Sequence, residues 1–373
     1  MIVKAPSEYL RYPGVTSDIG VRVKSLGDRA LVVAGRSALT AVAPKFAEGL
    51  KSAGVSYSLH PFSGYPTMSL MESLAQRLRD TSADAIIGIG GGRVMDTVKV
   101  AGNLAGVNIV TVPTVAATCA AWAAVAVVYN AAGEVVEIHQ NPRSPRYVLV
   151  DPHVIALSPS RYLKAGIVDT FAKWYEFEPN ARSNQGSLAL KVIVDEAKLA
   201  FDFLVEHGAE AIADAEANRC TDIFSQALDA IIFLAGFSGG LEDIGASGGF
   251  AHPFYNLSTL IQETHTCLHG EKVAFGLLAQ FVLEKRPREF IIEAVRLFRR
   301  FGQPTTLSEI GIDDIEPVRT IAKLAVERYQ LFETLGYGKE ASEIVLAILE
   351  ADRLSREVIV FGLAQQDKLY ACH

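Results

Sequence analysis

The stretch ADAIIGIGGGRVMDTVK, residues 83–99, decides the fold. A short apolar run ends in consecutive glycines, and a segment with helical spacing follows directly. Glycines let a backbone approach a ligand closely, and the first turn of a helix offers unpaired N–H groups and partial positive charge. The stretch therefore predicts a buried strand, a tight turn and a helix whose first turn binds a nucleotide phosphate or another anion.

The glycines alone leave the ligand open. Position 93 is arginine, so the G-x-G-x-x-G fingerprint is not met, and the G-K-[ST] ending of a P-loop is absent as well. Glycines between a strand and a helix are also common simply as turns. Asp96 has an equally simple interpretation, because an acidic residue in the first turn of a helix stabilises the helix dipole.

Outward from this stretch, short β runs alternate with helical patterns over the first 150 residues. We expect strands at 30–35, 55–62, 83–92, 108–113 and 146–151, a hairpin at 125–138, and helices at 37–54 (interrupted by Pro44), 68–83 and 93–105. Continuous apolar strands separated by helices predict a mostly parallel sheet covered on both faces. From about residue 160 helical periodicity dominates. We therefore expect an α/β domain over residues 1–155 and an all-helical domain over residues 156–373.

Composition narrows the class of protein. The chain has 373 residues, half of them apolar, and a net charge of −7, which argues against a nucleic-acid surface. Its four cysteines form no C-x-x-C pair, and no signal peptide is evident, so we expect a reduced, cytoplasmic protein. No charged residue lies between Lys99 and Glu134. Asn103, Asn108 and Pro113 interrupt this stretch, so we interpret it as buried strands and loops instead of a membrane span.

Five segments occur in an order that resembles the iron-type, or group III, alcohol dehydrogenase superfamily. They are GGGRVMDTVK, TVPTVAAT, YVLVDP, AGIVDTFAKWYE and HGEKVAFG. The similarity spans roughly residues 30–304 and is strongest to glycerol dehydrogenases and to a hydroxycarboxylate dehydrogenase branch. It implies a dehydroquinate synthase-like fold with an N-terminal dinucleotide-binding domain and a helical C-terminal domain. It also implies a nicotinamide cofactor, a divalent metal and a homo-oligomer.

The resemblance assigns the cofactor site by position. It implies that the dinucleotide contacts Gly90, Gly91, Gly92, Arg93, Val94, Asp96, Thr114, Thr118 and Tyr129. After the first strand, Gly35 and Arg36 stand where NAD-preferring relatives often carry an acidic residue for the ribose 2′-hydroxyl. We therefore expect NADP(H) to bind at least as well as NAD(H), although Arg36 has the alternative interpretation of an ordinary surface arginine.

The resemblance also assigns the metal ligands, Asp169, His252 and His269. His265 precedes His269 by four residues, a spacing that would allow both to point the same way, so we expect His265 to line the same cleft near the substrate. From the residues alone, an exposed i, i+4 ion pair between Asp169 and Lys173 is favoured over a metal role, and a lone histidine is more often a packed residue. A divalent metal would serve the chemistry of an alcohol dehydrogenase. Hydride leaves an alcohol carbon readily only when its oxygen is alkoxide-like, and a divalent ion lowers the pKa of that hydroxyl. Two nitrogens and one carboxylate suit Zn²⁺ or Fe²⁺ equally.

Cys119 departs from the glycerol dehydrogenase pattern T-x-x-x-T-D-A-P, which has aspartate at this position. A thiol cannot accept two hydroxyl hydrogen bonds as a carboxylate does. We therefore expect a small carbonyl or 2-oxo/2-hydroxy acid substrate, with a glycerol (polyol) dehydrogenase as the alternative. Cys119 also has the interpretation of a small buried residue.

Two other classes of function are considered for the chain. One is a dehydroquinate-synthase-like lyase, which the absence of arginine between Lys99 and Arg143 disfavours, and the other is a non-catalytic nucleotide-binding protein.

Overall fold

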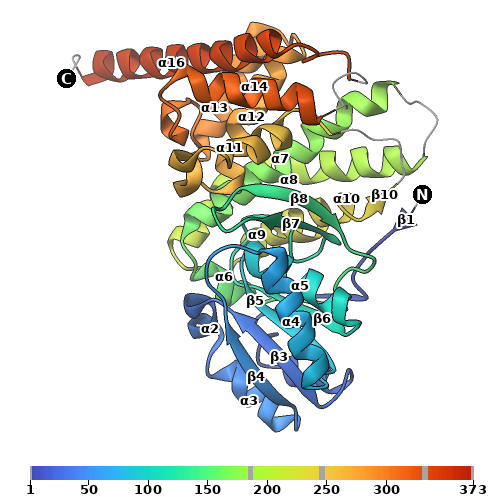
Figure 1. Ribbon diagram of the computed structural model, residues 1–373. Helices are drawn as coiled ribbons and strands as arrows, with labels where there is room; N and C mark the ends of the chain where they lie inside the picture. Colours follow the sequence, from blue (N-terminus) through green and yellow to red (C-terminus); the bar gives the residue numbers. More distant parts are fainter. Residues whose placement is uncertain (1, 184–187, 243–247, 330–334, 371–373) are drawn as a thin grey trace. The chain divides into compact units, whose positions relative to one another are not determined.

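The computed structural model describes residues 2–183, 188–242, 248–329 and 335–370 (Figure 1). The chain divides into two compact units, and neither is continuous in sequence. Unit 1 comprises Met1–Thr170 and Ser187–Ile244, and unit 2 comprises Phe171–Gly186 and Gly245–His373. The expected boundary at residue 155 marks where strands give way to helices along the chain, and it stays a prediction.

Unit 1 is built on a six-stranded parallel sheet. Its strands, in spatial order, are β2 (Glu8–Arg11), β9 (Tyr147–Val150), β6 (Asn108–Pro113), β5 (Ala85–Gly90), β3 (Arg29–Ala34) and β4 (Ser56–Pro61). The parallel α/β architecture expected from the sequence is therefore confirmed. The edge strand β2 was not expected, because its sequence EYLR mixes charged and apolar residues and its side chains are all half-buried.

The helix that follows the glycines packs tightly on the sheet. Every residue of β5 is buried, and α5 (Gly92–Ala105) is buried continuously from Val94 to Gly102. A Cβ atom at Gly102 would lie 2.4 Å from Cγ1 of Ile109, and one at Gly88 would lie 2.6 Å from Cγ2 of Val98. These glycines are therefore needed for the close approach of α5 to the strands beneath it.

Further elements complete unit 1. They are β1 (Ile2–Val3), α1 (Ile19–Lys24), α2 (Arg36–Val42), α3 (Lys45–Ser52), α4 (Met68–Asp80), the hairpin β7 (Val125–Tyr129) and β8 (Val135–Gln140), α6 (Pro152–Ala156), the first part of α7 (Ser160–Ser183), α8 (Leu188–Glu216), α9 (Asp222–Leu228), the π-helical η1 (Asp229–Leu234), α10 (Ala235–Ser238) and β10 (Leu241–Glu242). The uncharged stretch after Lys99 forms β6 and β7, as expected. In the described part of the chain, no helix has the length and apolar character that a membrane crossing requires.

The helices between residues 188 and 238 join unit 1 through contacts of η1 with strand β2. Asp229 accepts hydrogen bonds from Tyr9 Oη at 2.9 Å and from Arg11 Nε at 2.7 Å. The rings of Tyr9, Trp122 and Phe233 form an aromatic cluster with centroids 4.9–5.7 Å apart. These partners are distant in sequence, so helical periodicity alone could not assign this segment to the sheet-containing unit.

Unit 2 is helical. It contains the second part of α7, α11 (Ala251–Ser258), the 3₁₀ helix η2 (Gln262–Thr266), α12 (His269–Leu283), α13 (Arg288–Arg300), the 3₁₀ helix η3 (Ser308–Ile310), α14 (Ile315–Arg328) and α16 (Ala341–Tyr370). Almost every residue of α12 is buried, and α11, α13 and α16 all pack against it. A Cβ atom at Gly276 would lie 2.8 Å from the carbonyl oxygen of Ala251, so this glycine lets α11 and α12 meet closely.

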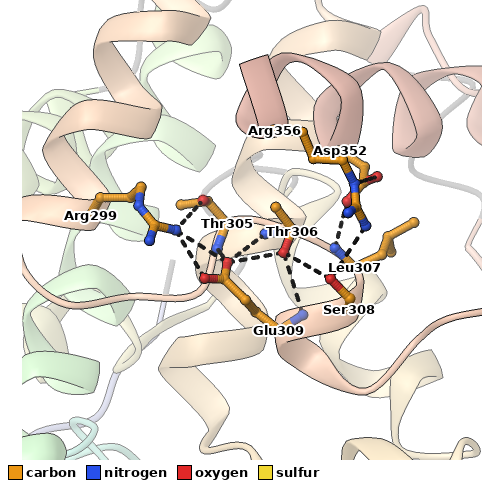
Figure 2. Close-up of polar contacts among 8 residues, drawn as sticks. All are labelled: Arg299, Thr305, Thr306, Leu307, Ser308, Glu309, Asp352 and Arg356. Carbon is orange, nitrogen blue, oxygen red and sulfur yellow. Dashed lines mark hydrogen bonds and ion pairs between the residues drawn. The ribbon is translucent and has the colours of Figure 1, made fainter. Parts of the chain in front are cut away.

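A polar cluster fixes the turn around η3 (Figure 2). Glu309 accepts hydrogen bonds from the backbone N–H groups of Thr305 and Thr306 at 2.9 and 3.1 Å, and from Arg299 at 3.0 Å. Asp352 of α16 accepts the N–H of Leu307 at 2.8 Å. Carboxylates therefore take the place of helical hydrogen bonds where the chain turns between α13 and α14.

Candidate functional site

The glycine loop lies at the carboxyl edge of the parallel sheet. Gly90 ends β5, Gly91 is the N-cap of α5, and Gly92 is its first residue. The backbone N–H of Thr114, after β6, donates to the carbonyl of Gly90 at 3.0 Å. A Cβ atom at Gly90 would lie 2.7 Å from Cγ2 of buried Val94. The N-cap residue Gly91 has no side chain that could cap the first turn of α5, and the N–H groups of such a turn suit an anion.

Three more of the residues expected to bind the dinucleotide, Gly35, Arg36 and Thr118, lie near the same edge. β3 pairs with β5 in parallel, so Gly35, the N-cap of α2, follows a strand end beside the glycine loop. Arg36 is exposed at the first position of α2. A Cβ atom at Gly92 would lie 3.4 Å from Oγ1 of Thr118, which places the loop after β6 beside the start of α5.

Asp96 lies in a buried ion pair that the sequence analysis missed. Its Oδ1 atom is 3.0 Å from Nζ of Lys99, whose side chain has no exposed surface. Lys99 also donates to the carbonyl of Ala123 at 2.9 Å and to that of Val125. A dipole interaction alone therefore does not describe Asp96, and the i, i+3 spacing of the two charges in an apolar helix was the available signal.

Tyr65 is a second residue that the sequence analysis missed. Its ring lies 5.7 Å from that of Tyr129, and the guanidinium carbon of Arg93 lies 4.3 Å from its centroid. A Cβ atom at Gly133 would overlap the Tyr65 ring, so the β7–β8 turn closes directly over it. Tyr65 thus connects two of the expected cofactor residues, Arg93 and Tyr129, through ring contacts.

Asp169, His252 and His269 come from α7, α11 and α12, and the structure brings them together. One candidate ligand atom from each lies within 4.8 Å of the others. Asp169 is 3% exposed, so an exposed ion pair with Lys173 does not account for it. One carboxylate and two imidazoles fit a Zn²⁺ or Fe²⁺ ion and leave coordination positions for a substrate.

His252 has a buried carboxylate partner. Oε2 of Glu176 lies 2.6 Å from Nδ1 of His252, and Oε1 accepts the backbone N–H of the same residue at 3.3 Å. Burial tends to raise the pKa of Glu176, but the neighbouring His252 and Lys173 and these hydrogen bonds lower it below its usual value. An ionised carboxylate keeps the proton on Nδ1, so Nε2 of His252 is the atom left to bind a metal. Glu176 lies seven positions after Asp169, the same face of α7 two turns later, and this spacing was the signal that could have found it.

The HGEK segment starts α12 at His269. Glu271 accepts the backbone N–H of Leu268 at 2.7 Å, which fixes the first turn of the helix. The His269 ring packs edge-on against Tyr255, with centroids 4.1 Å apart. Lys272 lies 4.9 Å from the Tyr255 ring and donates to Oγ1 of Thr264 at 3.3 Å. The glutamate and lysine of the segment therefore hold the helix that carries His269.

Among the described residues, the group of candidate metal ligands consists of Asp169, His252 and His269 and does not include His265 or Cys119. Nε2 of His265 lies 2.7 Å from the carbonyl oxygen of Thr259, one residue after α11. Cys119 is a half-buried thiol between Thr118 and Ala120. Their expected roles at the substrate stay predictions.

Comparison with known proteins agrees with this architecture. A model of the iron-containing alcohol dehydrogenase family matches residues 6–152. The chain is 32% identical over 362 residues to glycerol dehydrogenase of Citrobacter freundii, which covers 95% of this chain and 98% of the relative. It is 32% identical over 338 residues to hydroxycarboxylate dehydrogenase A of Escherichia coli strain K12, covering 90% and 92%. The crystal structure of a probable glycerol dehydrogenase from Sinorhizobium meliloti 1021 matches with a TM-score of 0.86 and 28% identity, covering 95% of this chain and 99% of that one.

These similarities extend over nearly the whole chain, and they confirm the expected fold with its helical C-terminal part. The family implies NAD(H) and a divalent metal ion as cofactors. The Asp169, His252 and His269 donor set is of the kind that such an ion requires. The chain therefore belongs to the iron-containing alcohol dehydrogenase family and is a metal-dependent oxidoreductase that acts on CH–OH groups.

Proposed function

We propose that this enzyme transfers hydride between a nicotinamide dinucleotide and a small 2-hydroxy acid or its 2-oxo acid. The observation that carries the proposal is the thiol of Cys119 in the loop after β6, where the glycerol dehydrogenase pattern has an aspartate. A thiol cannot accept hydrogen bonds from two substrate hydroxyls as an aspartate carboxylate can. It also does not repel a substrate carboxylate, as an aspartate would. The similarity to a hydroxycarboxylate dehydrogenase supports the same substrate class.

The residues divide the chemistry as follows. The N–H groups at the start of α5, around Gly91 and Gly92, bind the pyrophosphate, and Thr114, Thr118 and Tyr129 hold the nicotinamide half. Asp169, His252 and His269 would hold the divalent ion, which supplies the positive charge that lowers the pKa of the substrate hydroxyl. The carbinol carbon loses hydride to the oxidised nicotinamide ring, and the hydroxyl proton leaves to water. The carbonyl product and the reduced cofactor result.

We propose that NADP(H) serves at least as well as NAD(H). After β3 the chain continues as Gly35-Arg36-Ser37, with no carboxylate for a ribose 2′-hydroxyl and with an arginine that suits a 2′-phosphate. Zn²⁺ and Fe²⁺ both suit the donor set. Titration of the protein with NADH and with NADPH tests this preference, and much tighter binding of NADH contradicts it.

Reduction assays on a panel of 2-oxo acids, aldehydes and dihydroxyacetone, with glycerol in the oxidation direction, test the substrate class. The assays use apo protein reloaded with Zn²⁺ or Fe²⁺. The Cys119→Asp variant should lose activity on 2-oxo acids and gain activity on glycerol. The matched Cys119→Ser variant, which adds no charge, should keep the wild-type order of substrates. Wild-type activity on glycerol alone contradicts the proposal.

Glycerol oxidation is the second candidate, and the names of the glycerol dehydrogenase relatives favour it. A dehydroquinate-synthase-like lyase regenerates its cofactor, so net conversion of added NAD(P)H separates a dehydrogenase from it. We also propose that the protein is cytoplasmic, forms a homo-oligomer and has neither nucleic-acid nor membrane partners. Light scattering at micromolar concentration tests the oligomeric state. A monomeric mass contradicts the oligomer.

A further inference from the structure

Glu176 holds His252 by both its backbone and its ring. Oε1 accepts the N–H of His252 at 3.3 Å, and Oε2 lies 2.6 Å from its Nδ1 atom. The carboxylate is 5% exposed and belongs to unit 2 together with the histidine. A carboxylate has two oxygens for two N–H donors spaced in this way, so the side chain acts as a two-point clamp.

A second buried side chain fixes the same turn of helix. Oε1 of Gln280, on α12, accepts the N–H groups of Phe250 and Ala251 at 2.8 and 3.2 Å. Gln280 is fully buried, and its amide donates to the carbonyl of Tyr175 at 3.2 Å and to Glu284 at 2.8 Å. Three successive N–H groups at the start of α11 are therefore satisfied by α7 and α12, which leaves His252 little freedom to move.

A network of ion pairs continues from Gln280 through Glu284. Arg286 donates to Glu284 at 2.7 Å and to Glu178 at 3.1 Å. Glu178 stands two positions after Glu176 on α7 and forms an ion pair with Arg286. The same helix thus carries two largely buried glutamates: Glu176 contacts the candidate metal ligand His252, and Glu178 pairs with Arg286.

We propose that Glu176 is a positioning residue of the metal site: it fixes the ring of His252 with the proton on Nδ1 and leaves Nε2 as the ligand atom. The inference rests on the proposed metal-binding role of Asp169, His252 and His269. Its consequence is that metal affinity depends on a side chain that does not itself ligate the ion. A partner of this kind orients the imidazole and makes its free nitrogen a stronger base, and its loss weakens metal binding by about 10–100-fold.

The test measures the metal and the fold separately, on the full-length protein. Apo protein is titrated with Zn²⁺ against a chromophoric chelator, and the absorption spectrum of Co²⁺ bound to it reports ligand geometry. The variants are Glu176→Gln, the matched control Glu178→Gln and the ligand reference His252→Ala. We expect Glu176→Gln to raise the Zn²⁺ dissociation constant by about 10–100-fold and to change the Co²⁺ spectrum. Glu178→Gln should stay within about twofold of wild type.

The melting temperature of each apo variant distinguishes positioning from mere packing. A packing role lowers the melting temperature and leaves the Zn²⁺ dissociation constant unchanged, which overturns the inference. If Glu176→Gln does not fold, Glu176→Asp carries the same test, because the shorter carboxylate cannot reach both N–H groups; an unchanged dissociation constant there overturns it too. Wild-type protein that binds neither ion contradicts the proposed function and this inference together. Tight binding by both wild type and Glu176→Gln contradicts the inference alone.

Discussion

Lys99 and Asp96 form an ion pair inside unit 1: Nζ of the lysine lies 3.0 Å from Oδ1 of the aspartate, and the lysine side chain has no exposed surface. With the carbonyls of Ala123 and Val125, Asp96 provides an acceptor for each of the three N–H groups of the ammonium. The pair therefore ties α5, whose first turn lies at the cofactor loop, to the start of β7.

Removal of this charge should destabilise unit 1. Lys99→Met leaves a buried carboxylate and two carbonyls without their donor, so the free energy of unfolding should fall by roughly 3–5 kcal/mol. Urea denaturation measures it. The double variant Asp96→Asn/Lys99→Met should regain part of the loss. Exposed Lys51→Met is the control, and a loss of under about 1 kcal/mol in Lys99→Met contradicts the prediction.

Added metal should stabilise the apo protein. At a free Zn²⁺ concentration of about 100 times the dissociation constant, binding to the native state alone adds about 2.7 kcal/mol. The melting temperature should therefore rise with Zn²⁺ in the wild type and much less in Asp169→Asn or His269→Ala. Differential scanning calorimetry with and without a chelator measures the change. Equal shifts in all three proteins would mean that the ion binds elsewhere.

Gly90→Ala should strain the cofactor loop. Its Cβ atom would lie 2.7 Å from Cγ2 of Val94, a β-branched side chain with few rotamers to move into. We expect a loss of about 1–3 kcal/mol in the free energy of unfolding, together with weaker cofactor binding. Gly90→Ala/Val94→Ala should recover stability relative to the single variant. Gly248→Ala, where a new Cβ meets nothing within 4 Å, is the neutral comparison.

Arg36→Ala should weaken NADPH binding more than NADH binding, because only the former carries the 2′-phosphate. Fluorescence titration of the reduced cofactors gives both dissociation constants. Arg29→Ala, at the opposite end of the same strand β3, is the matched control and should change neither. An equal effect of Arg36→Ala on both dissociation constants would contradict the prediction and mean that Arg36 is an ordinary surface residue.

The Glu309 cluster should make stability depend on acid. Burial tends to raise the pKa of Glu309, but the Thr305 N–H, Arg299 and Thr306 lower it below its usual value (Figure 2). A lowered native pKa means that this stabilisation is complete above the unfolded pKa of about 4.3 and is lost as pH falls through the native pKa. Glu309→Gln should therefore cost about 1 kcal/mol or less at pH 7, since a third of the side chain is exposed, and almost nothing at pH 3. Urea unfolding at both pH values measures the difference, and equal costs contradict the assignment.

Local sequence patterns were sufficient for five of the six strands of the sheet and insufficient for β2 and for the helices that join the sheet from later in the chain. The apolar runs that become β5 and β6 are unambiguous because both faces of each strand are buried. β2 was missed because an edge strand of four half-buried residues lacks that pattern. The assignment of α8–α10 to unit 1 depends on contacts such as Asp229 with Tyr9, more than 200 residues away, which no local periodicity encodes.

The candidate site divides in the same way. The glycine loop follows from the chain's own pattern, whereas Asp169, His252 and His269 came from resemblance, since their spacing alone fits ordinary ion pairs and packed histidines. Glu176 and Lys99 were missed because the partners of each side chain come together only in the folded chain. Burial of a charge is invisible in sequence, yet it distinguishes these residues from surface neighbours of the same type.

Asp169 and Glu176 stand seven positions apart on the unbroken helix α7. At about 100° per residue, insertion or deletion of a single amino acid between them would rotate one carboxylate away from the other's side of the helix. This segment should therefore accept many exchanges of side chain but no change in length. Exposed loop segments outside the glycine loop and the Glu309 turn are not under this helical restriction, so length variants from a random library should be depleted here before they are depleted there.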